Sequence, residues 1–220
     1  AILQSGLLDT FRPAEATAFA EKVLKSLDIA PGDAAKLEQI PAEELIAAAA
    51  TVKETVPYKP VVDGVHVPAQ PGKIIASGGA AHISVIVGTT KDESRLFTLL
   101  HSRWQDADDE QRIALAEKMI GSPWSRVAAF YLSGGKKGEQ LSDALHSALS
   151  MANFGHDALR IAEHQSGHGG AVWMYRFDWE SPMFEGKLKA GHALDVPFVF
   201  HNLDHPSALA LTGDSPLRRR

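Results

Sequence analysis

Two carboxylates and one histidine follow apolar, strand-like segments of the chain. Residues 82–88 are rich in β-branched side chains and end in a glycine, and Asp92 and Glu93 come shortly after them. A second apolar segment, residues 171–177, precedes His192. A carboxylate bound to one ring nitrogen of a histidine fixes the tautomer, so that the other nitrogen can take a proton from a nucleophile and return it to a leaving group. The chain order of an acid and then a histidine matches that of a hydrolytic triad in which the nucleophile comes before both residues.

The nucleophile of such a triad is missing from the sequence. In the nucleophile elbow, Gly-x-Ser-x-Gly, a sharp turn between a strand and a helix exposes the serine. Ser5 lies between Gln4 and Gly6 but has no glycine two positions before it, so we do not assign it as the nucleophile. The chain has no cysteine, which excludes thiolate catalysis, disulfides and cysteine-ligated metal.

Two pairs of histidines offer a metal site as the competing chemistry. His164 and His168 are four residues apart, as are His201 and His205, and on a helix this spacing places two imidazoles on one face. The surrounding glycines and the proline at 206 indicate, however, that both pairs lie where helices end. Neither pair has the glutamate of a His-Glu-x-x-His motif. We therefore expect structural or exposed histidines and no metal ligands.

Composition and charge limit the classes of function. A chain of 220 residues with 45% hydrophobic and 22% charged residues can bury a substantial core, which excludes disordered and fibrous classes. The net charge of −5 provides no basic field for nucleic acid, and the Gly79 and Gly134 segments lack the arrangement that cradles phosphate. No segment approaches the roughly 20 apolar residues of a membrane span, and no signal peptide is visible. Cytoplasmic and secreted locations both remain open.

Hydrophobic periodicity predicts helices in the first fifty residues and between the two strand-like segments. The clearest helical patterns cover residues 14–24, 42–47, 108–117 and 141–149. Residues 56–79 contain several prolines and glycines and are predicted to form an ordered, packed loop. The 82–88 segment is typical of a strand that is covered on both faces.

Helices that alternate with apolar strands indicate an α/β fold with helices on the faces of a sheet. Two strands are too few for a stable sheet, and exposed apolar strands would template aggregation. We therefore expect that residues outside this chain, or a partner chain, complete the sheet.

Segments spread over nearly the whole chain resemble successive landmarks of the type-B carboxylesterases. Each landmark alone is weak, but together they occur in the family's order and at plausible spacing: residues 1–6, 60–64, 88–97, 175–182 and 192–200. The resemblance implies a partial α/β-hydrolase fold, namely the C-terminal part of the sheet with helical insertions. It also implies hydrolysis of small-molecule carboxylic esters by a Ser-Glu-His triad, without metal or organic cofactor.

The resemblance assigns the triad acid to Glu93 and the general base to His192. It places the serine elbow upstream of Ala1 and further helices beyond Arg220, so residues 1–220 would be one incomplete domain, truncated at both ends. The missing N-terminal half would then be needed to complete the sheet, and this chain alone would be nearly inactive. Taken alone, Glu93 is more typical of a first-turn acid favoured by the helix dipole, and only the flanking motif favours the triad role.

The chain departs from the family pattern near both predicted triad residues. Ser94 and Lys189 stand where the family usually has glycine, and Asp195 stands where it has glutamate. Asp195 suits either a carboxylate that supports the site or a helix cap. Four aromatic residues either line an ester pocket or, as their spacing favours, pack in the core: Trp124, Phe130, Trp173 and Phe198.

Two other classes of function compete with an esterase. A non-catalytic relative would use the hydrolase scaffold as an interaction surface, and the residue at the upstream elbow would decide between the two. An α/β domain of unrelated function would require all of the landmarks to match by accident. The presence of both Glu93 and His192 favours the enzyme, because a scaffold has no chemical use for the pair.

Overall fold

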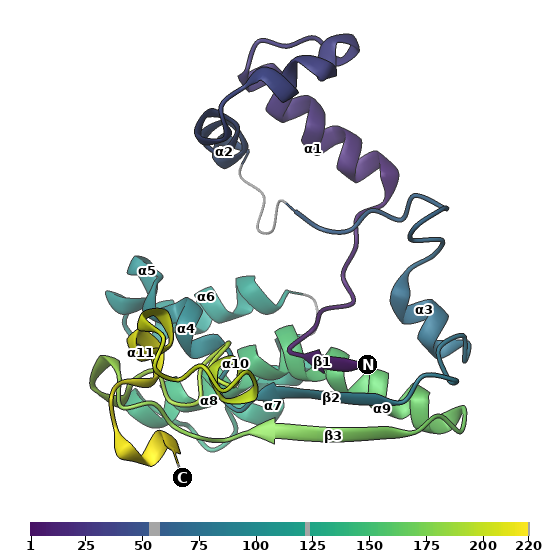
Figure 1. Ribbon diagram of the computed structural model, residues 1–220. Helices are drawn as coiled ribbons and strands as arrows, with labels where there is room; N and C mark the ends of the chain where they lie inside the picture. The colour runs from purple at the N-terminus through teal and green to yellow at the C-terminus, as the bar shows by residue number, and fades with distance from the viewer. Residues whose placement is uncertain (53–57, 122–123, 220) are drawn as a thin grey trace. The chain divides into compact units, whose positions relative to one another are not determined.

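The computed structural model describes residues 1–52, 58–121 and 124–219. The chain forms two compact units (Figure 1): a smaller one of residues Leu8–Ser77, and a larger one of Ala1–Leu7 and Gly78–Arg220.

The smaller unit is mainly helical. It contains α1 (Pro13–Ser26), a 3₁₀ segment η1 (Pro31–Gln39), α2 (Ala42–Thr51) and α3 (Pro71–Ala76). The patterns at 14–24 and 42–47 thus predict α1 and α2 correctly, and the proline that opens α1 has the fixed φ that suits a first helical turn. In the predicted loop 56–79, residues 56 and 57 lie outside the described residues, and α3 was not predicted.

The larger unit is built on a parallel sheet. Its strands are β1 (Ile2–Gln4), β2 (Val85–Thr90) and β3 (Val172–Phe177), in the order β1-β2-β3. Both pairings are parallel, with Leu3 opposite Val87 and Val87 opposite Met174. Strands β2 and β3 follow the sequence prediction, whereas β1 adds a strand that the periodicity did not predict.

Helices carry the chain between β2 and β3. They are α4 (Ser94–Leu99), α5 (Ser102–Gln105), α6 (Asp109–Ile120), α7 (Trp124–Tyr131), α8 (Gly138–Ser150), the π-helical turn η2 (Met151–Gly155) and α9 (His156–Gly167). Helix α9 packs against β2 and β3. The hydrophobic core lies between α5, α6 and α8 and is made of Trp104, Ala116, Leu141, Leu145 and Leu149.

Short helices follow β3. They are η3 (Phe184–Gly186), α10 (Val196–Val199), α11 (Pro206–Thr212) and η4 (Pro216–Arg219). In the three described ranges, no helix is both long enough and apolar enough to cross a membrane.

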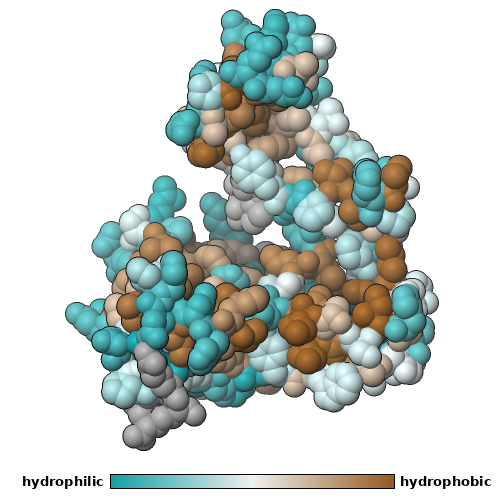
Figure 2. Space-filling view, viewed as in Figure 1, coloured by the Kyte–Doolittle hydropathy of each residue, from teal (hydrophilic) through white to brown (hydrophobic). Residues whose placement is uncertain are grey.

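One face of the sheet exposes a row of apolar side chains. Ile2, Ile86 and Trp173 are neighbours in register, and they are 65%, 41% and 59% exposed. Val85 and Val87, on the opposite face, are buried. The prediction that 82–88 is covered on both faces is therefore wrong for Ile86. Figure 2 shows hydrophobic surface over the strands.

The four aromatic residues assigned to the core divide in the structure. Trp173 and Phe130 are exposed, Phe130 by 75%. Trp124 packs against the hydrophobic core, and the Phe198 ring contacts those of Phe177 and Trp179.

Candidate functional site

Glu93 lies in the turn between β2 and α4 and is completely buried. Its Oε1 accepts a hydrogen bond of 2.6 Å from the backbone N–H of Thr90 and another from the Ser5 hydroxyl. Its Oε2 lies 2.5 Å from Nδ1 of His192. Donors on both oxygens hold the carboxylate in one orientation, with Oε2 directed at the imidazole.

His192 presents its ring between two aromatic side chains. The ring centroids of Phe97, on α4, and Phe154, in η2, each lie 5.0 Å from that of the imidazole. The His192 side chain is 29% exposed. Because Nδ1 faces Glu93, Nε2 is the nitrogen left for proton transfer, and no described residue forms a hydrogen bond with it.

Backbone contacts join the segments that carry Glu93 and His192. The N–H of Asp92 donates to the Ala190 carbonyl at 2.9 Å, and the N–H of Ala190 lies 3.3 Å from Oδ2 of Asp92. Burial raises the pKa of the Asp92 carboxyl group. These two bonds hold the segment that carries Glu93 against the segment that carries His192.

The residue at 189 shows why a glycine suits this position. Lys189 has a φ of 52°, a left-handed conformation that glycine adopts at lower cost. Its backbone pairs with Ser181, and its ammonium nitrogen lies 3.9 Å from Glu180 Oε2. The lysine therefore keeps the loop geometry and directs its charge to Glu180.

Asp195 binds side chains of strands β1 and β3 instead of capping a helix. It precedes α10 without forming a side-chain cap. Its Oδ2 accepts hydrogen bonds from Gln4 Nε2 at 2.9 Å and from the Tyr175 hydroxyl at 3.0 Å. Burial and the bond to Asp195 raise the pKa of Tyr175. Of the two sequence interpretations, the helix cap is therefore wrong, and a carboxylate that supports the site remains a prediction.

Gly88 leaves the space that the Tyr175 ring needs to reach Asp195. It lies between Gln4 and Tyr175 in the register of the sheet. A Cβ atom at this position would lie 2.3 Å from the Tyr175 ring and 2.4 Å from its carbonyl oxygen. Only glycine lets the Tyr175 ring cross the strand toward Asp195.

Ser94 fastens the start of α4 to α8. Its hydroxyl donates to the His146 carbonyl at 2.9 Å, and its N–H donates to the Ser150 hydroxyl at 3.1 Å. Ser94 is 2% exposed, so the extra hydroxyl beside Glu93 is fully used inside the protein.

The structure brings together both predicted site residues and adds others that sequence reasoning missed. Ser5, with a φ of 53°, contacts the acid and not the base. Phe97 and Phe154 flank the base. No motif in the sequence marks these three residues for such roles, because each is defined by a contact made across the fold.

An imidazole held by a buried carboxylate, with its second nitrogen free, can act as a general base and then as a general acid. Among the described residues, no serine hydroxyl forms a hydrogen bond with His192. In the part of the chain that the structure describes, the pair therefore has the chemical groups of an acid and a base but no nucleophile in hydrogen-bond contact.

The chain is similar to known proteins of one family. Residues 1–218 match the Carboxylesterase family. The chain is 35% identical over 213 residues to the para-nitrobenzyl esterase of Bacillus subtilis (strain 168), covering 93% of this chain and 41% of the relative. The crystal structure of a Geobacillus stearothermophilus carboxylesterase at pH 6.2 superposes with a TM-score of 0.81 at 35% identity, covering 99% of this chain and 45% of the other. A structure of a PNB esterase gives a TM-score of 0.70 at 32% identity, covering 94% and 44%.

The chain spans less than half the length of these relatives. The similarity confirms the predicted fold class, a partial α/β-hydrolase fold whose parallel sheet carries helical insertions. Since the family match extends over almost every residue, the chain belongs to the carboxylesterase family.

Proposed function

We propose that the complete protein hydrolyses small-molecule carboxylic esters with a Ser-Glu-His triad. The observation that carries this proposal is the 2.5 Å contact between Glu93 Oε2 and His192 Nδ1. In this mechanism His192 Nε2 takes the proton of a serine as it attacks the ester carbonyl, and returns it to the departing alkoxide. Water then hydrolyses the acyl-enzyme by the same exchange. Glu93 orients the imidazole and stabilises its protonated form.

We propose that the serine and the oxyanion donors come from a part of the protein upstream of residue 1. The relatives are more than twice as long as the matched region, and a triad acid and histidine follow the serine in this class of fold. The exposed row of Ile2, Ile86 and Trp173 supports this, because further strands and helices would bury it. On this proposal, residues 1–220 are an incomplete domain, and alone they turn over esters at a negligible rate.

Labelling with a fluorophosphonate probe tests the proposed function. The natural product of the full reading frame should form a covalent adduct, detected by intact mass, on a species longer than 220 residues. The His192→Ala variant should lose the label, because the serine is then not activated. A full-length product that never takes the label would contradict the proposal and favour a non-catalytic relative. Efficient labelling of the 220-residue chain alone would contradict the assignment of the nucleophile upstream.

The Ser5 hydroxyl gives a smaller, separate prediction. The Ser5→Ala variant removes one donor to Glu93 Oε1 and keeps the Thr90 N–H. We expect kcat for an activated ester to fall by roughly tenfold, as for loss of one hydrogen bond to a charged group. Ser166→Ala, at an exposed position of α9, is the control. A Ser5→Ala enzyme as inactive as His192→Ala would show that Ser5 does more than hold the acid.

A further inference from the structure

A cavity of about 400 Å³ lies beside α4, between this helix and α5, α6 and α8. Arg95 and Leu99, one turn apart on α4, line it, whereas Phe97 on the same helix contacts His192. Trp104, Arg112 and His146 form other parts of its wall. The volume falls in the range of small-molecule sites, and the cavity does not include the Glu93–His192 pair.

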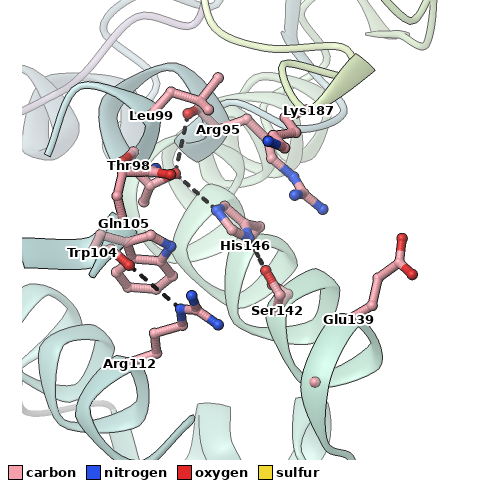
Figure 3. Close-up of a pocket in the computed structure, with 11 residues that line it drawn as sticks. Arg95, Thr98, Leu99, Trp104, Gln105, Arg112, Glu139, Ser142, His146 and Lys187 are labelled. Atoms are coloured by element: carbon pink, nitrogen blue, oxygen red, sulfur yellow. Dashed lines mark hydrogen bonds between the residues drawn. The ribbon is translucent and has the colours of Figure 1, made fainter. Parts of the chain in front are cut away.

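Two guanidinium groups, those of Arg95 and Arg112, line this cavity (Figure 3). Arg95 is 11% exposed in its side chain, and its buried Nε has no hydrogen-bond partner among the described residues. Its Nη2 binds Asp143 on α8. Within the described residues, the Arg112 guanidinium, from α6, makes two long contacts: its Nε lies 3.4 Å from the Trp104 carbonyl, and its Nη1 lies 3.9 Å from Asp109 Oδ1.

Guanidinium N–H groups removed from water need acceptors, and a planar oxyanion supplies them in matching geometry. The other charged groups on the wall are Lys187, which pairs with Glu185 at 2.7 Å, and Glu139. The Glu139 carboxylate would repel an anion. Arg95 and Arg112 are therefore the groups on the wall that favour the anionic end of a ligand.

His146 is a neutral part of the wall. Burial, followed by the nearby Arg95, lowers its pKa to about 4. Its Nδ1 faces the Ser142 carbonyl at 2.6 Å and its Nε2 faces the Thr98 hydroxyl at 2.8 Å. Both ring nitrogens are thus occupied within the protein. The imidazole and Leu99 leave the remainder of the cavity suited to an uncharged, partly apolar body.

We propose that this cavity binds a small organic anion whose carboxylate or phosphate is held between Arg95 and Arg112. All the residues that line this cavity lie within residues 95–187. Binding at the cavity therefore does not depend on the proposed nucleophile or on ester hydrolysis.

Calorimetric titration of the protein with benzoate and, separately, with phenyl phosphate at constant ionic strength tests the proposal. We expect saturable binding of at least one probe, and the preferred probe identifies the anionic group. Arg112→Met should weaken binding at least tenfold, whereas the matched change Arg160→Met, at an exposed site on α9, should change it less than twofold. The absence of saturable binding of both probes up to about 10 mM, or equal affinities for Arg112→Met and the unaltered protein, would overturn the proposal.

A second variant, Asp143→Asn, is expected to bind the probe more tightly, and misfolding would not produce tighter binding. Asp143 competes for the Arg95 guanidinium and is 51% exposed in its side chain. Asp143→Asn should release the Arg95 donors and tighten binding of the preferred probe several-fold. Unchanged or weaker binding by a folded Asp143→Asn protein would count against Arg95 as an anion ligand.

Discussion

Replacing His192 with alanine in the full-length protein should lower kcat for an activated ester by roughly 10⁴-fold or more. The imidazole is the group proposed to take the serine proton and return it to the leaving group, so its loss removes both transfers. Because these interactions strengthen only in the transition state, KM should change little. Glu93→Gln keeps the volume but cannot stabilise an imidazolium with a charge, and we expect a loss of roughly 10³-fold. Initial rates with a nitrophenyl ester provide the measurement.

The matched control is His156→Ala, which removes an exposed histidine at the start of α9 and should leave the rate unchanged. Circular dichroism and urea unfolding of each variant separate loss of chemistry from loss of fold. The His192 side chain is partly exposed, so its truncation should be tolerated. A folded His192→Ala enzyme that keeps more than about a tenth of the rate would remove His192 from the triad.

The sequence assigned Glu93 and His192 to one site because both follow strand signals and lie within family landmarks. Glu93 and His192 are 99 positions apart, yet parallel strands bring their C-terminal ends to one edge of the sheet. Hydrophobic periodicity did not predict strand β1, because three residues are too short to show a period. Its extended conformation is fixed by pairing with β2, with Ile2 opposite Ile86.

Supporting residues of the site were harder to predict, for a different physical reason. Ser5, Phe154 and Tyr175 act through contacts with residues distant in sequence, and such contacts leave no local spacing pattern. Exposed Trp173 illustrates the same limit. Its residue type favours burial, but whether it is covered depends on which elements pack on that face of the sheet.

Acid should destabilise the fold through His146. This histidine is 3% exposed, and burial together with Arg95 holds its pKa at about 4, against about 6.5 in an unfolded chain. Between these two values the unfolded state binds the additional proton, so the free energy of unfolding should fall as the pH falls from 6.5 to 4. The full difference is about 3 kcal/mol, a large part of the stability of a typical domain.

His146→Leu should remove this contribution, because leucine fills the site and does not titrate. The Thr98 hydroxyl keeps an acceptor in the Ser94 carbonyl at 3.1 Å. Urea unfolding followed by tryptophan fluorescence is a suitable measurement, since the Trp104 ring lies 5.3 Å from that of His146. Between pH 7 and pH 4.5 the variant should lose less stability than the unaltered protein, while His156→Leu, at an exposed site, should follow the unaltered protein. Equal pH dependence in all three proteins would show that His146 is not the group whose protonation opposes folding.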